Sequence, residues 1–231
     1  DFGDSFPAAS CGALGEDTTM FTLYYAPDTC ALATLIAFKD AGLQAGGDYA
    51  LRRVDFAKLE QRAPEYLAVN PKGRVPALVT PRGILTETPA MLAFLAQSFP
   101  QANLAPLEDP FAFADMQAFN SFLCSSLHVA HAHRMRGHRW VDEANTTAIK
   151  AMQDKVPDSV GACYDLIESG MLKGPWVMGE DYTIADPYLF TIAQWLEQDG
   201  VDPARIPRIV DHRARMAARA NVKAALAEEN A

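Results

Sequence analysis

Short apolar runs alternate with a helical pattern over the first part of the chain. Residues 21–25 are aromatic, aliphatic or β-branched and contain no Gly or Pro, which predicts a buried strand. Pro27 and Asp28 end that run, and the apolar positions after Ala31 follow helical spacing. The same patterns predict further strands at residues 49–55, 76–79 and 84–86, and a helix that begins at Glu87 or Thr88.

The order of these elements indicates a fold class. A strand, a helix and a strand, followed by two strands and a helix, form the layout of a thioredoxin-like domain with a mixed four-stranded sheet. We expect this domain over residues 20–100 and a proline-containing linker over 101–110. Residues 111–231 show helical spacing almost throughout and predict an all-helical bundle, so the expected fold class is α+β.

Two local sequence features occur in the helical half. A helix expected over residues 142–168 contains Pro157, which predicts a kink or an interruption. Thr183 and Asp186 have the spacing of a capping box, in which the Thr183 hydroxyl accepts the Asp186 N–H and Asp186 bonds back to Thr183. A buried helix extending to Leu196 is expected after this box, and helices near 207–219 and 221–229 complete the chain.

Residues 1–19 differ from the rest of the chain. They are acidic and have neither a basic segment nor an apolar core, so they do not have the pattern of a signal peptide. Met20 directly precedes the first predicted strand. We expect residues 1–19 to be a leader or extension outside the fold.

Charge and cysteine usage narrow the class of protein. The 231 residues carry a net charge of −9 with a pI of about 5.0, which argues against nucleic acid or an anionic membrane as partners. The four cysteines lie far apart without a CxxC or metal-like pairing, which favours a reducing, cytoplasmic environment. No apolar run is long enough to predict a membrane-spanning helix.

Cys30 is the first candidate for chemistry, because it lies where a strand gives way to a helix. Unpaired N–H groups at a helix start favour a thiolate over a thiol. The position that completes a thioredoxin-type dithiol holds Ala33, so this thiol needs an external thiol partner such as glutathione. The alternative is a small apolar side chain packed under the helix.

Four stretches of the chain carry a family resemblance. They are residues 24–33 around Cys30, residues 70–78 (Asn-Pro-Lys-Gly-Arg-Val-Pro-Ala-Leu), residues 85–88 (Leu-Thr-Glu-Thr) and residues 183–191 around Asp186. In this order and spacing the chain resembles the cytosolic glutathione S-transferases, and most closely the bacterial beta class with a cysteine at the first helix. The resemblance covers about residues 20–230 and implies the glutathione transferase fold.

The resemblance also implies how glutathione binds. Val75-Pro76 is expected to be a cis peptide whose Val75 backbone pairs with the extended tripeptide. Thr88 and the helix start are expected to hold the γ-glutamyl carboxylate, and Glu87 its ammonium. The glycyl carboxylate is assigned to Lys58 or Lys72.

Two further residues are assigned near the sulfur. Tyr25 is a candidate hydroxyl donor, although a core strand tyrosine is the alternative, and His128 matches the histidine that beta-class enzymes place near the glutathione sulfur. His131, His133 and His138 crowd the same stretch. Helical spacing separates His133 from the face shared by His128 and His131, and no carboxylate or cysteine completes a set, so no metal is expected.

Several positions depart from the family pattern. Ala31 stands where a serine is frequent, Val129 where a lysine often follows the histidine, and Asn120 lies one residue before the usual asparagine position, which here is Ser121. The co-substrate side of the pocket is therefore expected to differ, with walls provisionally assigned to four residues: Phe119, Phe122, Met135 and Trp140.

The expected function is that of a glutathione transferase. It acts either by conjugating glutathione to an apolar or electrophilic co-substrate or by thiol–disulfide exchange through a partly ionised Cys30. The sequence leaves these two chemistries open. The alternatives are a binding or regulatory protein that keeps the fold without turnover, and a specialised lyase or dehalogenase. The family implies a homodimer.

Overall fold

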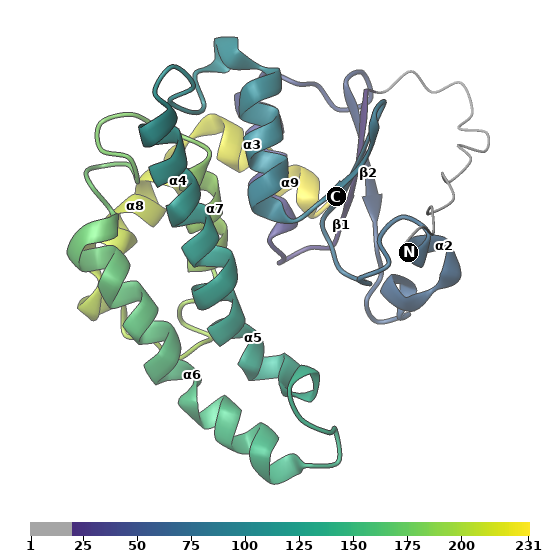
Figure 1. Cartoon of the computed structure of the whole chain (residues 1–231), viewed down its shortest axis with the longest axis vertical. Coiled ribbons are helices and arrows are strands. Elements are labelled where there is room, and N and C mark those ends of the chain that lie inside the picture. Colours follow the sequence, from purple (N-terminus) through teal and green to yellow (C-terminus); the bar gives the residue numbers. More distant parts are fainter. Residues whose placement is uncertain (1–19) are drawn as a thin grey trace, which may run out of the picture.

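The computed structural model describes residues 20–231, so the predicted leader at 1–19 lies outside the described residues. A four-stranded mixed sheet is followed by a helical half, and this confirms the predicted α+β class. Figure 1 shows the sheet at one side of the molecule and the helices α4 to α8 at the other.

The sheet has the strand order β2-β1-β3-β4. Strand β1 pairs in parallel with β2, whereas β3 runs antiparallel to both β1 and β4. The elements of this half are β1 (Phe21–Tyr25), α1 (Ala31–Asp40), β2 (Tyr49–Arg53), η1 (Glu60–Arg62), α2 (Pro64–Leu67), β3 (Ala77–Thr80), β4 (Gly83–Thr86), α3 (Thr88–Ser98) and η2 (Pro100–Ala102).

The helical half contains two π-helical turns, one between two α-helices and one at the end of another α-helix. Its elements are α4 (Pro110–Phe122), η3 (Leu123–Leu127), α5 (His128–Arg136), η4 (Gly137–Arg139), α6 (Thr146–Leu166), η5 (Ile167–Met171), α7 (Ala185–Ala193), η6 (Pro203–Arg205), α8 (Pro207–Ala218) and α9 (Ala220–Glu229). The π turns are η3 and η5.

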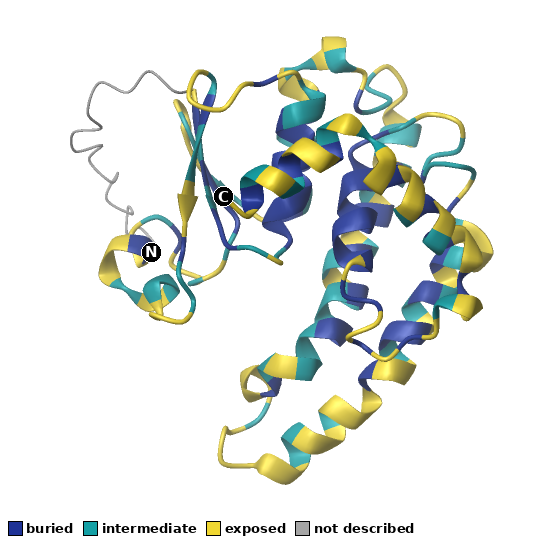
Figure 2. Cartoon of the chain, turned by 180° about the vertical axis from the view of Figure 1, so that it is seen from behind, coloured by how far each residue is buried: buried dark blue, intermediate teal, exposed yellow. Residues whose placement is uncertain are grey.

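One core joins the two halves. Helix α1 contacts α3, α7 and α9, so the helix that starts at Cys30 lies between the sheet and the helical half. All residues of α7 are buried. Figure 2 shows the buried residues concentrated where helices pack on one another and on the sheet, while the far end of α6 is exposed.

The helix α6 differs from the sequence prediction at its start, and it is not interrupted at Pro157. It begins at Thr146, where the Asn145 side chain accepts the Ala148 N–H, and it continues through Pro157 without interruption. Val156 and Val160, on either side of the proline, are buried in the core. Burial of these side chains offsets the backbone hydrogen bond that proline cannot make.

The capping arrangement before α7 differs in part from the prediction. Asp186 accepts the Thr183 N–H at 2.7 Å, as expected, but the Thr183 hydroxyl accepts from Ala185 at 3.3 Å instead of from Asp186. Asp186 also accepts from the Val177 N–H at 2.8 Å and lies 3.0 Å from His212 Nε2. The helix ends at Ala193, so Leu196 lies in the following turn.

Candidate active site

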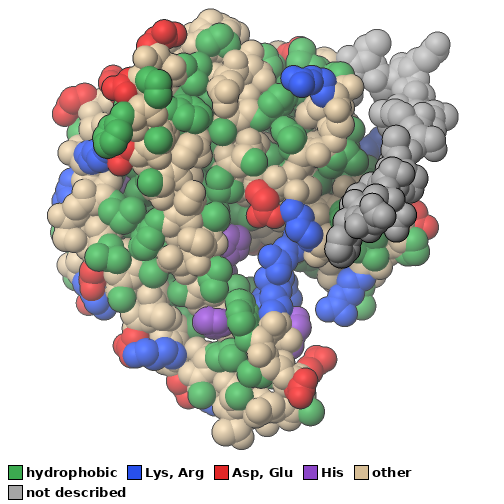
Figure 3. All heavy atoms as spheres, in the orientation of Figure 1, with side chains coloured by type: hydrophobic (Ala, Val, Ile, Leu, Met, Phe, Trp, Pro, Cys, Tyr) green, Lys and Arg blue, Asp and Glu red, His purple; other side chains and the backbone are tan. Residues whose placement is uncertain are grey.

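A cavity of about 980 Å³ lies between the sheet half and the helical half. The β1–α1 loop, the segment before β3 and the start of α3 form one wall, and the region from η3 to η4 forms the other. Figure 3 shows a hollow between the halves, with Lys and Arg side chains along it and histidines beside them. Its volume suits a ligand of a few hundred daltons.

The segment before β3 is held in place by its own hydrogen bonds. The Arg74 carbonyl accepts from the buried Asn70 side chain and from the Tyr66 hydroxyl, each at 2.6 Å. Gly73 has a φ of +60°, and a Cβ on it would meet the Gln61 carbonyl oxygen at 2.9 Å. This position therefore requires glycine, and the constraint fixes where Arg74 and Val75 enter the cavity wall.

Val75-Pro76 is a cis peptide bond, as predicted. Both residues line the cavity. The Cys30 sulfur lies 3.9 Å from the Val75 carbonyl oxygen, so the segment before β3 and the start of α1 meet at this point.

Cys30 occupies the N-cap position of α1 and is 8% exposed. Burial raises the pKa of its thiol to about 11; the Thr88 hydroxyl and the Cys30 N–H oppose this effect, and Glu87 and Cys124 add to it. The Ala31 N–H is directed at the Thr29 hydroxyl at 3.4 Å. The prediction of a partly ionised Cys30 is therefore wrong for the ligand-free protein, because desolvation outweighs the helix start.

Glu87 and Thr88 lie at the start of α3 on the cavity wall. Glu87 is the N-cap residue with a φ of 73° and makes no side-chain cap bond; Thr88 is the first helical residue and is buried. A non-glycine residue in this backbone region costs about 1–3 kcal/mol and is frequent at binding sites. Lys72 Nζ lies 2.5 Å from Glu87 Oε1 and 2.6 Å from the Thr86 hydroxyl.

His128 begins α5 and lines the opposite wall. Its ring packs against Trp195, with the ring centroids 5.2 Å apart. Burial, and after it the charges of His131, Arg139 and Arg74, lower the pKa of His128 to about 4, although Glu87 opposes them. The imidazole is therefore neutral at pH 7 and able to donate or accept a hydrogen bond.

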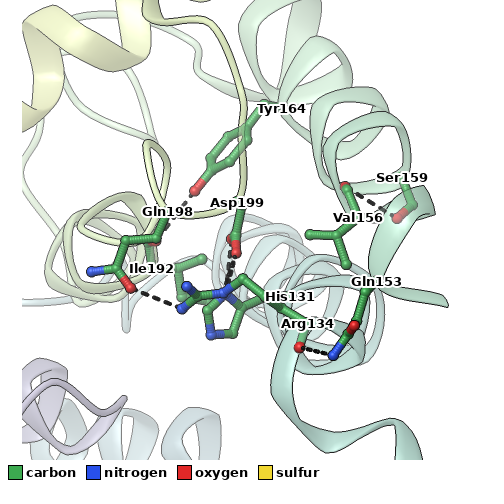
Figure 4. Close-up of polar contacts among 9 residues, drawn as sticks. All are labelled: His131, Arg134, Gln153, Val156, Ser159, Tyr164, Ile192, Gln198 and Asp199. Carbon is green, nitrogen blue, oxygen red and sulfur yellow. Dashed lines mark hydrogen bonds and ion pairs between the residues drawn. The ribbon is translucent and has the colours of Figure 1, made fainter. Parts of the chain in front are cut away.

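His131 has a structural environment. Its Nδ1 contacts both Asp199 oxygens, at 2.8 and 2.9 Å, and Arg134 pairs with the same carboxylate at 3.1 Å. Figure 4 shows His131 and Arg134 converging on Asp199 beneath the loop that follows α7. His131 also stacks on Trp195 with the centroids 4.2 Å apart, so this cluster fixes the surface against which His128 packs.

Some assigned residues lie away from the cavity. Tyr25 is buried in strand β1 and Lys58 is exposed beside Asp55, and neither belongs to the cavity lining. Of the predicted co-substrate residues, Met135 and Trp140 line the cavity, whereas Phe119 is a core residue and Phe122 packs at the edge of that core. The assignment of these two phenylalanines to the cavity wall is therefore wrong, because both side chains pack in or against the core.

The structure also brings residues to the cavity that the sequence did not single out. These are the three arginines Arg74, Arg136 and Arg139, a second cysteine, Cys124, and the aromatic residues Tyr188 and Trp195. Arg74 lies inside one of the quoted motifs, so its position was visible in the sequence. Tyr188, in α7, also lies inside a quoted motif. Cys124, Arg136 and Arg139 reach the cavity from η3, α5 and η4, and Trp195 reaches it from the turn after α7.

Residues 20–231 contain no group of three or more His, Cys, Asp or Glu side chains arranged to hold a metal ion. Within the same residues, no helix is long and apolar enough to span a membrane.

Comparison with known proteins places the chain among relatives of one kind. Residues 19–97 match the family described as glutathione S-transferase, N-terminal domain, and residues 130–220 match its C-terminal domain. The glutathione S-transferase GstA of Escherichia coli O157:H7 is 30% identical over 210 residues, which cover 90% of this chain and 98% of that protein.

Solved structures give the same result. A glutathione transferase homologue from Sulfitobacter, with bound glutathione, is 46% identical with a TM-score of 0.85, over 91% of this chain and 98% of that one. A bacterial beta-class glutathione S-transferase from Sphingomonas chungbukensis is 29% identical with a TM-score of 0.73, over 90% of this chain and 98% of that one.

Proposed function

This chain belongs to the glutathione S-transferase family, and on that premise we propose that it binds glutathione in the cavity and conjugates it to an electrophile. The observation that carries the proposal is the convergence of four separate segments on one cavity. Cys30, Val75-Pro76, Glu87-Thr88 and His128 all line it, although they are far apart in the sequence.

The geometry supports an extended glutathione along the sheet half. The γ-glutamyl carboxylate would lie at the start of α3 beside Thr88, where helix N–H groups attract anions, and its ammonium would pair with Glu87. The backbone of Val75 would pair with the cysteinyl part, which directs the sulfur towards Cys30. Of the two lysines assigned to the glycyl carboxylate, Lys72 is the one in the cavity lining. It pairs with Glu87 in the ligand-free structure, so the bound ammonium would have to replace it there before it reaches the glycyl carboxylate.

The raised pKa of Cys30 favours conjugation over thiol–disulfide exchange. Exchange needs the Cys30 thiolate as nucleophile, and with a pKa of about 11 its ionisation at pH 7 costs about 5 kcal/mol. A protonated Cys30 is instead an S–H donor towards a glutathione thiolate. That thiolate attacks the electrophilic carbon, a C–S bond forms, and the leaving group departs with its electron pair.

A substitution at Glu87 tests glutathione binding. Glu87→Gln removes the carboxylate proposed to hold the ammonium, and we expect it to weaken glutathione binding by about tenfold to a hundredfold, as for other charge-assisted contacts. Glu65→Gln, on the exposed surface of α2, is the matched control and should bind as the wild type. The measurement is calorimetric titration with glutathione, together with turnover of a chlorodinitrobenzene.

The results for Glu87→Gln and the wild type distinguish a transferase from a protein that only binds glutathione. Equal affinities for Glu87→Gln and the wild type would contradict the proposed placement of glutathione. Tight binding without turnover of any electrophile would point to a protein that keeps the fold for binding alone. Family membership also supports a homodimer and a cytoplasmic location, which we propose for this chain.

A further inference from the structure

Resting on the function proposed above, we infer that the second substrate carries a carboxylate, which Arg74, Arg136 and Arg139 bind on the helical side of the cavity. The three arginines come from both halves of the molecule. Arg74 lies before β3, Arg136 ends α5 and Arg139 ends η4. All three line the cavity, and Figure 3 shows basic side chains gathered along its opening.

The three guanidinium groups have no carboxylate partner within residues 20–231. No Asp or Glu oxygen of those residues lies within 4.0 Å of them, whereas Arg134, Arg205, Arg213 and Arg219 each pair with a carboxylate. Other arginines of the described residues, such as the exposed Arg53 and Arg82, also lack a carboxylate partner, but these three share the lining of one cavity. Three like charges without counter-ions attract an anionic ligand.

The arginines are also close enough to affect one another. Burial lowers the pKa of Arg139, and the charges of Arg74 and then Arg136 lower it further. The charges of Arg139 and Arg74 also lower the pKa of His128, which lines the same cavity. An anion bound there would relieve this repulsion.

Glutathione alone does not account for this charge. It has two carboxylates and one ammonium; we have placed one carboxylate at Thr88, the ammonium at Glu87 and the glycyl carboxylate near Lys72. The cavity lining holds five Arg or Lys side chains, Arg62 and Lys72 among them, against the carboxylates of Asp28 and Glu87. Three arginines therefore remain for a second molecule.

Neighbouring residues suggest the rest of that molecule. Met135 and Trp140 line the same part of the cavity and are exposed, so they offer an apolar surface beside the arginines. A guanidinium binds a carboxylate through two parallel hydrogen bonds and stacks on flat rings. The substrate class is thus an electrophile with an apolar or aromatic body and a carboxylate.

A matched pair of electrophiles tests this inference. A chlorodinitrobenzoate and its methyl ester differ mainly in charge, and each is conjugated when the glutathione thiolate attacks the ring carbon, the C–S bond forms and chloride leaves with its electron pair. Each kcat/KM is divided by the uncatalysed rate with glutathione, which corrects for ring reactivity. We expect the wild type to favour the benzoate by about tenfold or more, as charged hydrogen bonds predict.

Substitutions of the arginines show which side chains cause the preference for the benzoate over the ester. Arg139→Gln and Arg74→Gln should each reduce the benzoate-to-ester ratio by about tenfold through a higher KM for the benzoate, and Arg139→Lys should keep part of it. Arg82→Gln, on the exposed turn between β3 and β4, should behave as the wild type. Calorimetry with glutathione is run on every variant.

Three results would overturn the inference. They are a wild type without preference for the benzoate, a preference that survives both glutamine variants, and a loss of glutathione affinity in those variants that accounts for the change. In each case turnover of the ester would leave the proposed transferase function standing. Failure to conjugate either compound would instead contradict that function, and this inference with it.

Discussion

The sulfur of Cys30 is enclosed by the Val75 carbonyl, the side chain of Thr88 and the start of its own helix. A helix N-terminus stabilises a nearby anion by at most about 2 kcal/mol, whereas full burial shifts a pKa by as much as 3–5 units. The larger effect is desolvation, so Cys30 is a thiol at neutral pH. In the function proposed above, this thiol would donate a hydrogen bond to the glutathione sulfur.

The reactivity of Cys30 tests this conclusion. Because iodoacetamide alkylates the thiolate, we expect labelling of the Cys30 peptide in the glutathione-free protein to rise with pH towards a midpoint of about 11. Peptide mapping by mass spectrometry separates it from the other cysteines, and a small unfolded peptide of the same sequence is the reference. A midpoint below that of the peptide would show a poised thiolate and contradict the account.

At the scale of elements, most strands and helices followed from hydrophobic spacing, but several boundaries did not. Strand β1 and the starts of α1 and α3 agree with the pattern, because apolar period and turn residues coincide there. The π turns η3 and η5 keep a helical apolar pattern, so spacing does not reveal them. Pro157 does not interrupt α6, and local propensity could not show this, because it carries no information about burial of the neighbouring valines.

The last helix contributes a pH-dependent contact to the loop that precedes Cys30. Glu229 at the end of α9 is 2% exposed, and Oε1 of this carboxyl has no hydrogen-bond partner within residues 20–231. Burial, and then the charge of Asp28, raise the pKa of Glu229 to about 7, although the Asp28 N–H opposes this shift. The folded state therefore holds this proton more tightly than the unfolded chain, whose glutamates titrate near pH 4.3.

The variant Glu229→Gln tests whether protonation of Glu229 makes the stability of the fold depend on pH. Between about pH 4.3 and pH 7 the unfolded chain has lost the proton that the folded state keeps, so Glu229 lowers stability as pH rises. We expect Glu229→Gln to match the wild type near pH 4 and to be more stable by up to about 3 kcal/mol at pH 8. Urea unfolding at several pH values, with the exposed Glu180→Gln as control, measures this. A difference that does not change with pH would contradict the shift.

At the scale of the whole molecule, the site combines residues that the sequence identified with residues that only the packing reveals. Cys30, Pro76, Glu87-Thr88 and His128 were identified because each lies in a short motif at an element boundary, and the cavity brings them together. Tyr25 and Lys58 were assigned to it by the same resemblance but point elsewhere, into the core and towards Asp55.

The three cavity arginines show why the sequence did not predict the co-substrate side of the site. Arg136 and Arg139 lie on a helical segment with no distinctive spacing, and they meet Arg74 only where α5 and η4 face the sheet half. Local sequence patterns do not predict which distant segments come into contact in the folded chain. The sequence therefore predicted the glutathione side of the cavity better than the co-substrate side.

The proposed role of Cys30 depends on where the sulfur of glutathione lies, and a crystal structure of the protein with glutathione measures this directly. We expect the γ-glutamyl carboxylate at the start of α3, beside Thr88 and Glu87. The glutathione sulfur should lie at hydrogen-bond distance from Cys30 Sγ, with no bond between them. A mixed disulfide between Cys30 and glutathione, or a glutathione bound away from Thr88, would contradict the account.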